Sequence, residues 1–416
     1  MSARDGVIEP ATAATLAIGG LVSLAVAMGI GRFAFTPILP MMMRDGAVDI
    51  ASASWLASAN YIGYLLGAVL CTLQPWLAAR IPSLPAAFDA PRTVRAGLAA
   101  TALLTLGMAL PLPATWPALR FAAGVASAVT LIHTTGWCFA QLAARGRSAI
   151  GGLVFAGPGA GIVVSGAVAG GLVGAHRSAA VGWAVFAVLA VIATAAVWRV
   201  FDHRNDLAPA ATAGAAAGDA KALAAPRAEV AMLALGYGLA GFGYIVTATF
   251  LPVIARAALP GSTWIVWFWP LFGIGTIAGA ILATLISDDT DRRLLLAAAH
   301  AMQAAGVTLG LLWPTVAGFV AGSFLVGLPF TTITYFALQE ARRLRPKQVA
   351  SAIGLLTALY GVGQIAGPPM VSALVATSAD AAFAFDESLL IAATALLVGT
   401  ALYLALWRLW PTPARR

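Results

Sequence analysis

Residues 29–40 read Gly29-Ile30-Gly31-Arg32-Phe33-Ala34-Phe35-Thr36-Pro37-Ile38-Leu39-Pro40. Apart from one arginine, this run and the residues before it are apolar enough to lie in a lipid bilayer. An arginine at the bilayer midplane costs about 2.5–3.5 kcal/mol on insertion scales, so such residues face a polar cavity or a partner. Arg32 therefore marks a candidate functional path inside a membrane helix.

A fainter copy of this run lies in the second half of the chain, shifted by 212 residues. The shift pairs Gly29 with Gly241, Gly31 with Gly243, Leu39 with Leu251 and Pro40 with Pro252. Farther along, the shift falls to 198 residues, because the loop after Arg80 is longer than the loop after Arg292. A repeat of this kind indicates two copies of one structural unit.

The composition is that of an integral membrane protein. The chain has 416 residues, of which 61% are hydrophobic and 10% are charged, and its mean hydropathy is +0.90. Soluble domains carry about 25% charged residues, whereas apolar stretches of about 20 residues can span a bilayer as helices. We expect an all-α integral membrane fold with twelve transmembrane helices, at 14–43, 52–78, 94–112, 115–142, 149–174, 178–200, 229–256, 262–286, 294–313, 315–340, 350–376 and 386–410.

Basic residues predict the orientation of these helices. If both termini are cytoplasmic, 19 of the 24 Lys and Arg residues lie on the cytoplasmic side, in agreement with the positive-inside rule. This distribution explains the formal net charge of +8 without a nucleic-acid partner. The first apolar stretch is longer than the core of a signal peptide, so we expect no cleavable one. Cys71 and Cys138 lie inside predicted spans, which argues against a disulfide framework.

The segment between the two sets of six predicted spans differs in composition from the rest. Residues 201–228 are rich in Ala, Gly and Asp and have too few bulky apolar side chains to form a core. We therefore predict an N-terminal six-helix bundle at 1–200, a cytoplasmic linker at 201–228 and a C-terminal six-helix bundle at 229–416. Two such repeats in one chain are a transporter architecture.

Several short motifs resemble those of the major facilitator superfamily. The Gly-Arg-Phe-Ala-Phe-Thr-Pro-Ile-Leu-Pro run resembles a first-helix signature of a poorly characterised bacterial branch of that superfamily. The run from Arg120 to Gly124 is similar to its fourth-helix motif, and Gly157-Pro158-Gly159-Ala160-Gly161 to its fifth-helix Gly-Pro motif, which returns as Gly367-Pro368. The resemblance implies a major facilitator fold, in which two halves rock about a cavity lined by helices one, four, seven and ten.

The same resemblance implies which residues bend the helices or gate the cavity. Gly157 and Pro158 would form a hinge in the fifth helix. The loop from residue 288 to 293 resembles the acidic-basic loop between helices eight and nine, which makes Asp288, Asp291 and Arg292 candidate gate residues. The counterpart loop between helices two and three has a basic residue but no nearby aspartate, so no equivalent gate charge is expected there.

Polar side chains at membrane depth are the candidate substrate contacts. At about 100° per residue, Arg32 and Thr36 share one helical face, and the repeat makes Tyr244 the counterpart of Arg32. His133 lies about 140° around its helix from Arg120, so only one of the two can face the cavity centre. The complete set is Arg32, Thr36, Asn60, Tyr64, Arg120, His133, Tyr244, Thr331, Tyr335, Tyr360 and Gln364.

Three of these residues have alternative roles. Arg32 either faces the cavity or hydrogen-bonds to backbone carbonyls exposed by Pro37 and Pro40, which would lock a broken helix. Arg120 lies near one end of its predicted span, where its side chain could instead extend to the membrane interface. His133 is either a proton carrier or a partner in an interhelical hydrogen bond.

The charges that are missing at membrane depth bear on the substrate. All sixteen Asp and Glu residues fall in termini, loops or helix ends. A site with an arginine and no acid favours an anion, so we expect a secondary active transporter for a small organic anion such as a carboxylate, located in the bacterial inner membrane. The alternatives are a drug efflux pump, which the Gly-Pro motif favours, and a non-transporting sensor.

The remaining expectations concern chemistry and partners. We expect no enzymatic activity, cofactor or metal site, because the predicted spans contain neither paired acids nor clusters of metal ligands. The expected partners are a small-molecule substrate, the lipid bilayer and a coupling proton if His133 or the substrate carries one. Gly63-x-x-x-Gly67 and Gly275-x-x-x-Gly279 predict close packing against a helix of the same half, which favours a monomer.

Overall fold

The computed structural model describes residues 11–81, 83, 88–206, 226–287, 289–346 and 348–411. Every regular element in these ranges is a helix, and eleven candidate spans have the length and hydropathy of a bilayer crossing. One further helix, α4 (Ala90–Gly107), is not among the eleven, and its first two turns carry Arg92 and Arg95, which lower its hydropathy. Most of the predicted linker lies outside the described residues.

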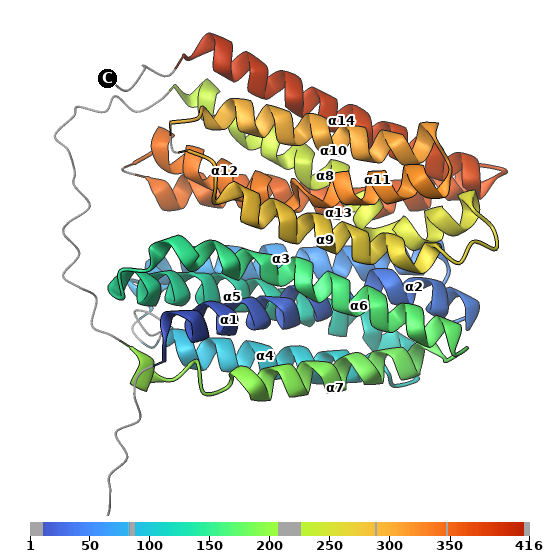
Figure 1. Ribbon diagram of the computed structural model, residues 1–416, viewed down its shortest axis with the longest axis horizontal. Helices are drawn as coiled ribbons and strands as arrows, with labels where there is room; N and C mark the ends of the chain where they lie inside the picture. Colours follow the sequence, from blue (N-terminus) through green and yellow to red (C-terminus); the bar gives the residue numbers. More distant parts are fainter. Residues whose placement is uncertain are drawn as a thin grey trace, which may run out of the picture.

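The helices of the first half of the chain lie together, and so do those of the second half (Figure 1). The first half contains α1 (Ala13–Leu24), η1 (Ala25–Ile30), α2 (Phe35–Arg44), α3 (Ile50–Ala78), α4, η2 (Pro113–Thr115), α5 (Trp116–Ala144), η3 (Ser148–Ala156), α6 (Gly157–Gly174), α7 (Ala179–Val197) and η4 (His203–Asn205). The second half contains α8 (Arg227–Ala258), α9 (Ile265–Ala283), α10 (Arg292–Leu312), α11 (Val316–Gly327), α12 (Phe330–Leu344), α13 (Val349–Thr377) and α14 (Ala381–Leu409).

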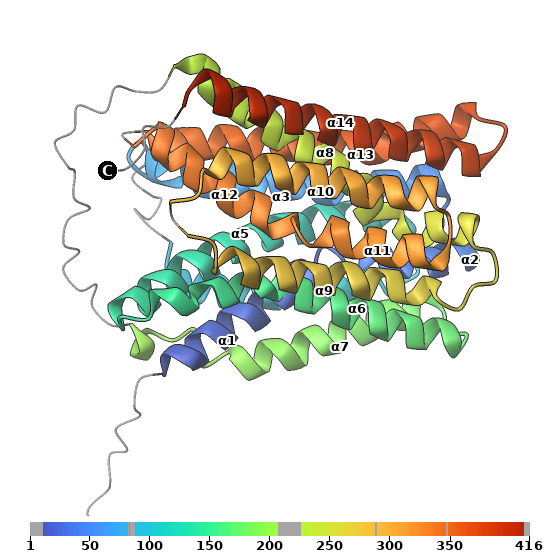
Figure 2. The same cartoon turned by 45° about the horizontal axis from the view of Figure 1, so that its top comes forward.

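The helices of both halves run along one common axis, so the molecule has two ends (Figures 1 and 2). We call the end with the start of α1 and the end of α14 the terminal end. The opposite end, which holds the α2–α3 and α8–α9 connections, is the distal end. Asp89 explains why α4 begins at Ala90 rather than at the predicted residue 94: its carboxylate accepts a hydrogen bond from the amide of Arg92 at 3.0 Å and caps the helix.

The first predicted span is interrupted in its middle. A π-helical segment, η1, follows α1, and the amide of Gly31 still donates to the carbonyl of Val26, five residues earlier, at 2.9 Å. Residues 31–34 then form a turn before α2 begins. Pro37 has no N–H to give to the carbonyl of Phe33, which accepts from the amide of Thr36 at 3.2 Å instead. Arg32 lies in this turn and Thr36 lies in α2, so the helical face predicted to hold both is interrupted between them.

Glycine allows helices of the same half to approach closely. A Cβ added to Gly63 would lie 2.0 Å from the carbonyl oxygen of Phe121 in α5, and one added to Gly279 would lie 1.7 Å from that of Leu328, next to α11. Both partner segments belong to the same half as the glycine, as the sequence predicted. Neither position can accept a larger side chain without moving a backbone.

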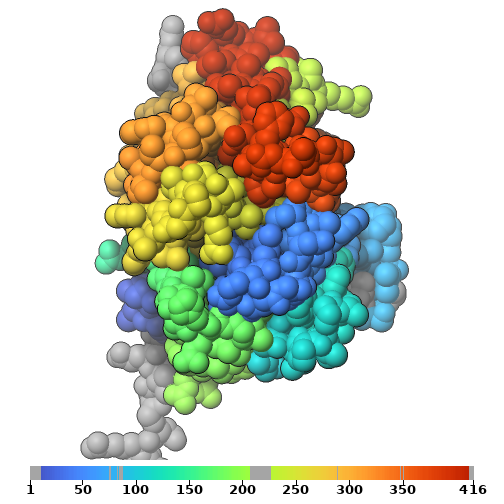
Figure 3. Space-filling view, turned by 90° about the vertical axis from the view of Figure 1, so that its right-hand side faces the viewer, coloured from blue at the N-terminus to red at the C-terminus, as the bar shows by residue number. Residues whose placement is uncertain are grey.

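The two halves meet mainly along four pairs of helices: α2 with α8, α3 with α13, α6 with α9, and η3 with α9. The α6–α9 pair is visible side by side in Figures 1 and 2. Here the carbonyl oxygen of Gly159 lies 2.8 Å from where a Cβ on Gly273 would be, and the reciprocal distance is 2.7 Å. At the distal end, Figure 3 shows the blue α2–α3 region lying against the yellow and red segments of the second half.

Candidate functional site

The break in the first helix presents Arg32 to aromatic side chains of α3. The Arg32 side chain is buried, with 3% of its surface exposed. Its guanidinium carbon lies 4.0 Å from the ring centroid of Tyr64 and 5.1 Å from that of Tyr61. Cation–π contacts of this kind partly replace the water that a buried guanidinium loses.

The second half contributes polar groups to the same place. Tyr244 in α8 and Tyr360 in α13 both act electrostatically on Arg32. The rings of these two tyrosines are stacked with centroids 5.9 Å apart, and Gln364 Nε2 donates a hydrogen bond to the Tyr244 hydroxyl. We call these residues, together with the two tyrosines of α3, the Arg32 cluster: Arg32, Tyr61, Tyr64, Tyr244, Tyr360 and Gln364.

The Arg32 cluster has the electrostatics of an anion site. The Nε and Nη2 atoms of Arg32 have no hydrogen-bond partner within the described part of the chain. The groups that act most strongly on its charge are tyrosines, and none is a carboxylate. In a low-dielectric interior a guanidinium with free N–H groups binds a carboxylate or a similar oxyanion through charge-assisted hydrogen bonds. Within the described residues, Arg32 therefore has free donors rather than an ion pair.

Arg120 does not reach the membrane interface, so that alternative from the sequence is wrong. The side chain is 2% exposed and turns inward from α5. Its Nη1 donates to the carbonyl of Gly31 and its Nη2 to that of Arg32, both at 3.1 Å. These carbonyls lie in the turn that interrupts the first helix, where regular helical partners are lost. The role of locking a broken helix, considered for Arg32, belongs to Arg120.

Replacing Arg120 with glutamine is expected to lower the thermal stability of the protein. The change leaves two buried carbonyl groups, of Gly31 and Arg32, without donors, at about 1–3 kcal/mol for each unsatisfied group. Differential scanning fluorimetry in detergent would measure the shift in melting temperature. Arg177→Gln is the control, because Arg177 is exposed in a distal loop. Equal melting temperatures of the two variants would contradict the assigned role.

Thr36 lies at a closure between the halves. Its hydroxyl donates to the carbonyl of Ala248 at 2.5 Å. That carbonyl would normally accept from residue 252, but Pro252 has no N–H. Nearby, the hydroxyls of Tyr61 and Thr249 are 2.9 Å apart. Both bonds join the first half to the second, and both lie in the distal half of α8.

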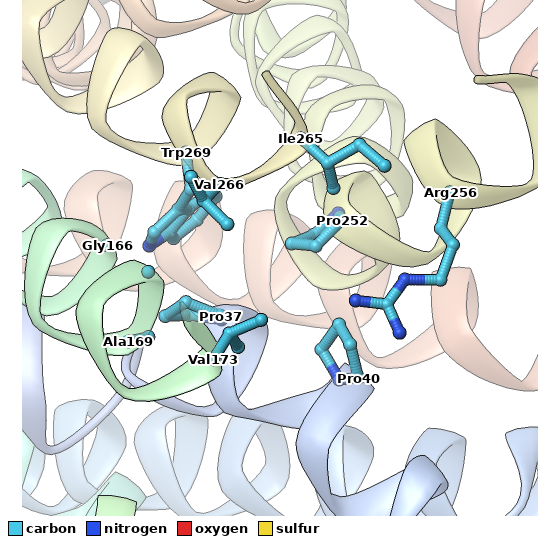
Figure 4. A pocket seen from close by; sticks show the side chains of 11 residues that line it. Pro37, Pro40, Gly166, Ala169, Val173, Pro252, Arg256, Ile265, Val266 and Trp269 are labelled. Atoms are coloured by element: carbon cyan, nitrogen blue, oxygen red, sulfur yellow. The ribbon is translucent and has the colours of Figure 1, made fainter. Parts of the chain in front are cut away.

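The prolines of the repeated run meet at this closure. Figure 4 shows Pro40 of α2 facing Pro252 of α8, with the side chain of Arg256 beside them. The cavity that these residues line has a volume of only about 20 Å³, too small for any substrate larger than water. The two halves are therefore closed against each other at the distal end.

A much larger cavity opens between the halves toward the terminal end. It has a volume of about 650 Å³ and is lined by residues of α5, η3, α9 and α12. Among the predicted site residues, Thr331 and Tyr335 line it, and the hydroxyl of Thr331 has no hydrogen-bond partner in the described residues. Its lining does not include Arg32. The predicted set is thus divided between this cavity and the Arg32 cluster.

Besides Thr36 and Arg120, two further predicted site residues, Asn60 and His133, lie outside both places. Asn60 Nδ2 donates to the carbonyl of Arg120 at 2.9 Å, so this side chain joins α3 to α5. The ring of His133 packs edge-on against Phe88, with centroids 6.0 Å apart, and its Nε2 has no partner within the described residues. The structure therefore does not bring His133 to Arg32.

The Gly-Pro motif packs alternate glycines on two different helices. Gly157 and Gly161 face the first helix, where a Cβ on Gly161 would lie 2.6 Å from the Cα of Gly29. Gly159 faces α9 of the other half, as described above. Pro158 lies at the start of α6, directly after the 3₁₀ segment η3. The motif thus touches the moving interface between the halves on one side and its own half on the other.

The candidate gate loop leads into an ion-pair network in the second half. Asp291 caps α10 and pairs with Arg293 at 2.7 Å, and Arg292 Nε donates to Gln339. The network continues from Arg293 to Glu340, at 3.9 Å. Asp288 lies outside the described residues. Sequence reasoning missed Arg293 and Glu340. Glu340 could have been found, because Arg343 follows it by three residues, which is the spacing of an ion pair within a helix.

The first half also has an aspartate at the end of the corresponding loop, nine residues after Arg80. Asp89, farther along that loop, caps α4 and lies 2.8 Å from Nε2 of His203. Asp206 Oδ2 lies 2.9 Å from the other ring nitrogen. Hydrogen bonds to Asp206 and Asp89 raise the pKa of His203 above its usual value. Each half therefore has an aspartate at the N-terminus of its third helix, with a cationic or ionisable partner.

Tyr61 and Phe33 are members of the site that the prediction omitted. Tyr61 is three residues before Tyr64, a spacing that places both on one face of a helix and could have identified it. Phe33 lies 5.3 Å from the Arg32 guanidinium carbon and packs on Phe330 of the second half. Its position could not have been found by counting, because it lies in the turn that interrupts the helix.

Comparisons with known proteins agree with this architecture. Residues 24–404 match the family described as "Uncharacterised MFS-type transporter YbfB". A "Chloramphenicol resistance protein" of Streptomyces lividans is 29% identical over 401 residues, which cover 91% of this chain and 94% of that protein. The crystal structure of a single-substitution mutant of the nucleoside transporter NupG superposes with a TM-score of 0.67 at 16% identity, over 94% of this chain and 100% of that one, and shares the fold.

Proposed function

The chain belongs to the family described as "Uncharacterised MFS-type transporter YbfB", and we propose that it carries a small organic anion across the bacterial inner membrane by alternating access. The observation that carries this proposal is the environment of Arg32. Within the described residues, this guanidinium, buried between the two halves, has aromatic neighbours and two N–H-bearing atoms without a hydrogen-bond partner, and no carboxylate is among the groups that act on it most strongly. A carboxylate substrate would supply the missing negative charge.

We further propose the topology expected from the sequence. With α4 counted as a span, each half contributes six spans, and the terminal end is cytoplasmic. Basic residues support this orientation: Arg44, Arg177 and Arg256 lie in distal segments, whereas residues 80, 92, 95, 145, 199, 292, 293, 342, 343 and 408 are arginines of terminal segments. The protein works as a monomer in this proposal, since each glycine pair has its partner within the chain.

The described conformation is then inward-facing. The cavity of about 650 Å³ opens toward the cytoplasmic side, while the hydrogen bonds of Thr36 and Tyr61 keep the opposite side closed. A substrate entering this cavity would pass Thr331 and Tyr335 before reaching the Arg32 cluster. Opening of the distal end requires these interhalf bonds to break.

Drug efflux is a second candidate function. It is favoured by the name of the Streptomyces lividans relative and by the Gly-Pro motif of α6. The aromatic rings of the Arg32 cluster would also suit a planar, uncharged compound. The two candidates differ in whether the substrate must carry a negative charge.

Transport into proteoliposomes would separate the two candidates. We expect saturable uptake of a radiolabelled carboxylate, tested with benzoate and succinate, and no saturable uptake of the cationic dye rhodamine 6G. Chloramphenicol tests the efflux candidate in the same vesicles. Uptake of chloramphenicol or the dye without any carboxylate uptake would reject the anion proposal and favour efflux.

A further inference from the structure

The site contains two buried positive charges rather than one. Arg32 and Arg120 are 3% and 2% exposed, and they come from the first and fourth spans. The charge of Arg32 acts on the Arg120 guanidinium, so the two repel each other. Their contacts are neutral: aromatic rings around Arg32, and two backbone carbonyls with the ring of Phe35 around Arg120.

Another buried arginine of the same chain is surrounded by carboxylates. Arg293 is 1% exposed, and it has Asp291 at 2.7 Å with Glu229 and Glu340 at 3.9 Å. By contrast, among the described residues no carboxylate is one of the groups that act most strongly on Arg32 or Arg120. Nε of both arginines and Nη2 of Arg32 also lack a hydrogen-bond partner within the described residues. The central pair therefore has two charges and open N–H groups, and the described part of the chain supplies no anion to them.

An unpaired buried charge is costly, and the cost is greatest when water is excluded. During alternating access the site must pass through a state that is closed at both ends. A bound carboxylate neutralises one charge in that state and accepts hydrogen bonds from the open N–H groups. An empty carrier has to pass through that closed state with both charges unpaired. Loaded and empty carriers should thus reorient at very different rates.

We propose that this protein is an anion exchanger, in which the loaded site reorients much faster than the empty one. The inference rests on the proposed function and adds the mode of transport. Each inward step with one carboxylate is followed by an outward step with another. Since equal charges cross in both directions, exchange of one monocarboxylate for another moves no net charge across the membrane.

Exchange and net uptake can be compared in proteoliposomes. One batch is loaded with unlabelled benzoate or succinate, and a matched batch contains only zwitterionic buffer. Labelled benzoate or succinate is then added outside. We expect uptake into the loaded vesicles to be at least about tenfold faster, which corresponds to about 1.4 kcal/mol of barrier difference. Equal rates in both batches would overturn the exchange inference and leave the proposed function intact. Absence of uptake in both batches would reject the proposed function and the inference together.

The conformation of the empty carrier provides a second measurement. Spin labels at Ser148 and Ile286 lie on opposite halves of the large cavity, after Cys71 and Cys138 have been replaced by serine. Without carboxylate, double electron–electron resonance should show a single distance distribution. Added benzoate or succinate should produce a second, shorter distance as the cavity closes. Two distances already present in carboxylate-free buffer, unchanged by either compound, would contradict the proposal.

Discussion

Arg32→Gln is expected to reduce carboxylate uptake about a hundredfold. Charge-assisted hydrogen bonds are worth about 1.5–3 kcal/mol each, and the loss of two at Nε and Nη2 corresponds to at least a factor of about 100. Glutamine keeps a polar group of similar length but has no charge. Initial rates of labelled benzoate or succinate exchange in proteoliposomes would measure the effect.

Two comparisons distinguish this result from a folding defect. Arg44→Gln is the matched control, because Arg44 lies on α2, is partly exposed and pairs with Asp45 at 2.9 Å. It should leave exchange unchanged. The melting temperature of Arg32→Gln should not fall, since the substitution removes an unpaired buried charge. Wild-type exchange by Arg32→Gln would reject the anion site, whereas a large loss of stability would make Arg32 a structural residue.

Gly29→Leu is expected to prevent correct assembly of the first half. A Cβ on Gly29 would lie 2.3 Å from the Cα of Gly161 and 2.6 Å from its carbonyl carbon, both backbone atoms of α6. No rotamer change relieves such a contact, so the first and fifth spans must separate. Overpacking of a well-packed interior costs about 1–3 kcal/mol and often more when a backbone has to move. Size-exclusion chromatography after detergent extraction would show loss of the monodisperse peak.

The matched control for this prediction is Gly171→Leu. A Cβ at Gly171 meets nothing within 4 Å, and the residue lies on the same α6 helix. Its elution profile and melting temperature should remain those of the wild type. A monodisperse Gly29→Leu protein with wild-type melting temperature would show that the first and fifth spans do not need this contact.

Part of the site was accessible from sequence because it follows from the repeat and from charge. Tyr244 was predicted as the counterpart of Arg32, and the structure places the two in one cluster. The absence of acidic residues from the middle of the spans was also visible, and it leads to the anion hypothesis. Both are properties of residue type and position along the chain, which need no knowledge of packing.

The role of Arg120 could not be obtained in that way. Its partners, the carbonyls of Gly31 and Arg32, lack regular helical partners because the first helix is interrupted. Helical counting assumes an unbroken helix, so it left Arg120 near a membrane surface. The motif around residues 288–293 likewise indicated a charged loop, but not that Arg293 is the residue buried among the acids.

The amino-acid sequence was sufficient for the apolar helices, the repeated halves and an arginine that must have a reason to lie in the membrane. Hydropathy, glycine spacing and charge are local quantities, and each can be counted along the chain. Only the folded structure showed which arginine supports the broken helix, which tyrosines surround the other, and at which end the halves part. Those features depend on contacts between residues far apart in the chain, such as Thr36 with Ala248, whose geometry is set by how whole helices pack.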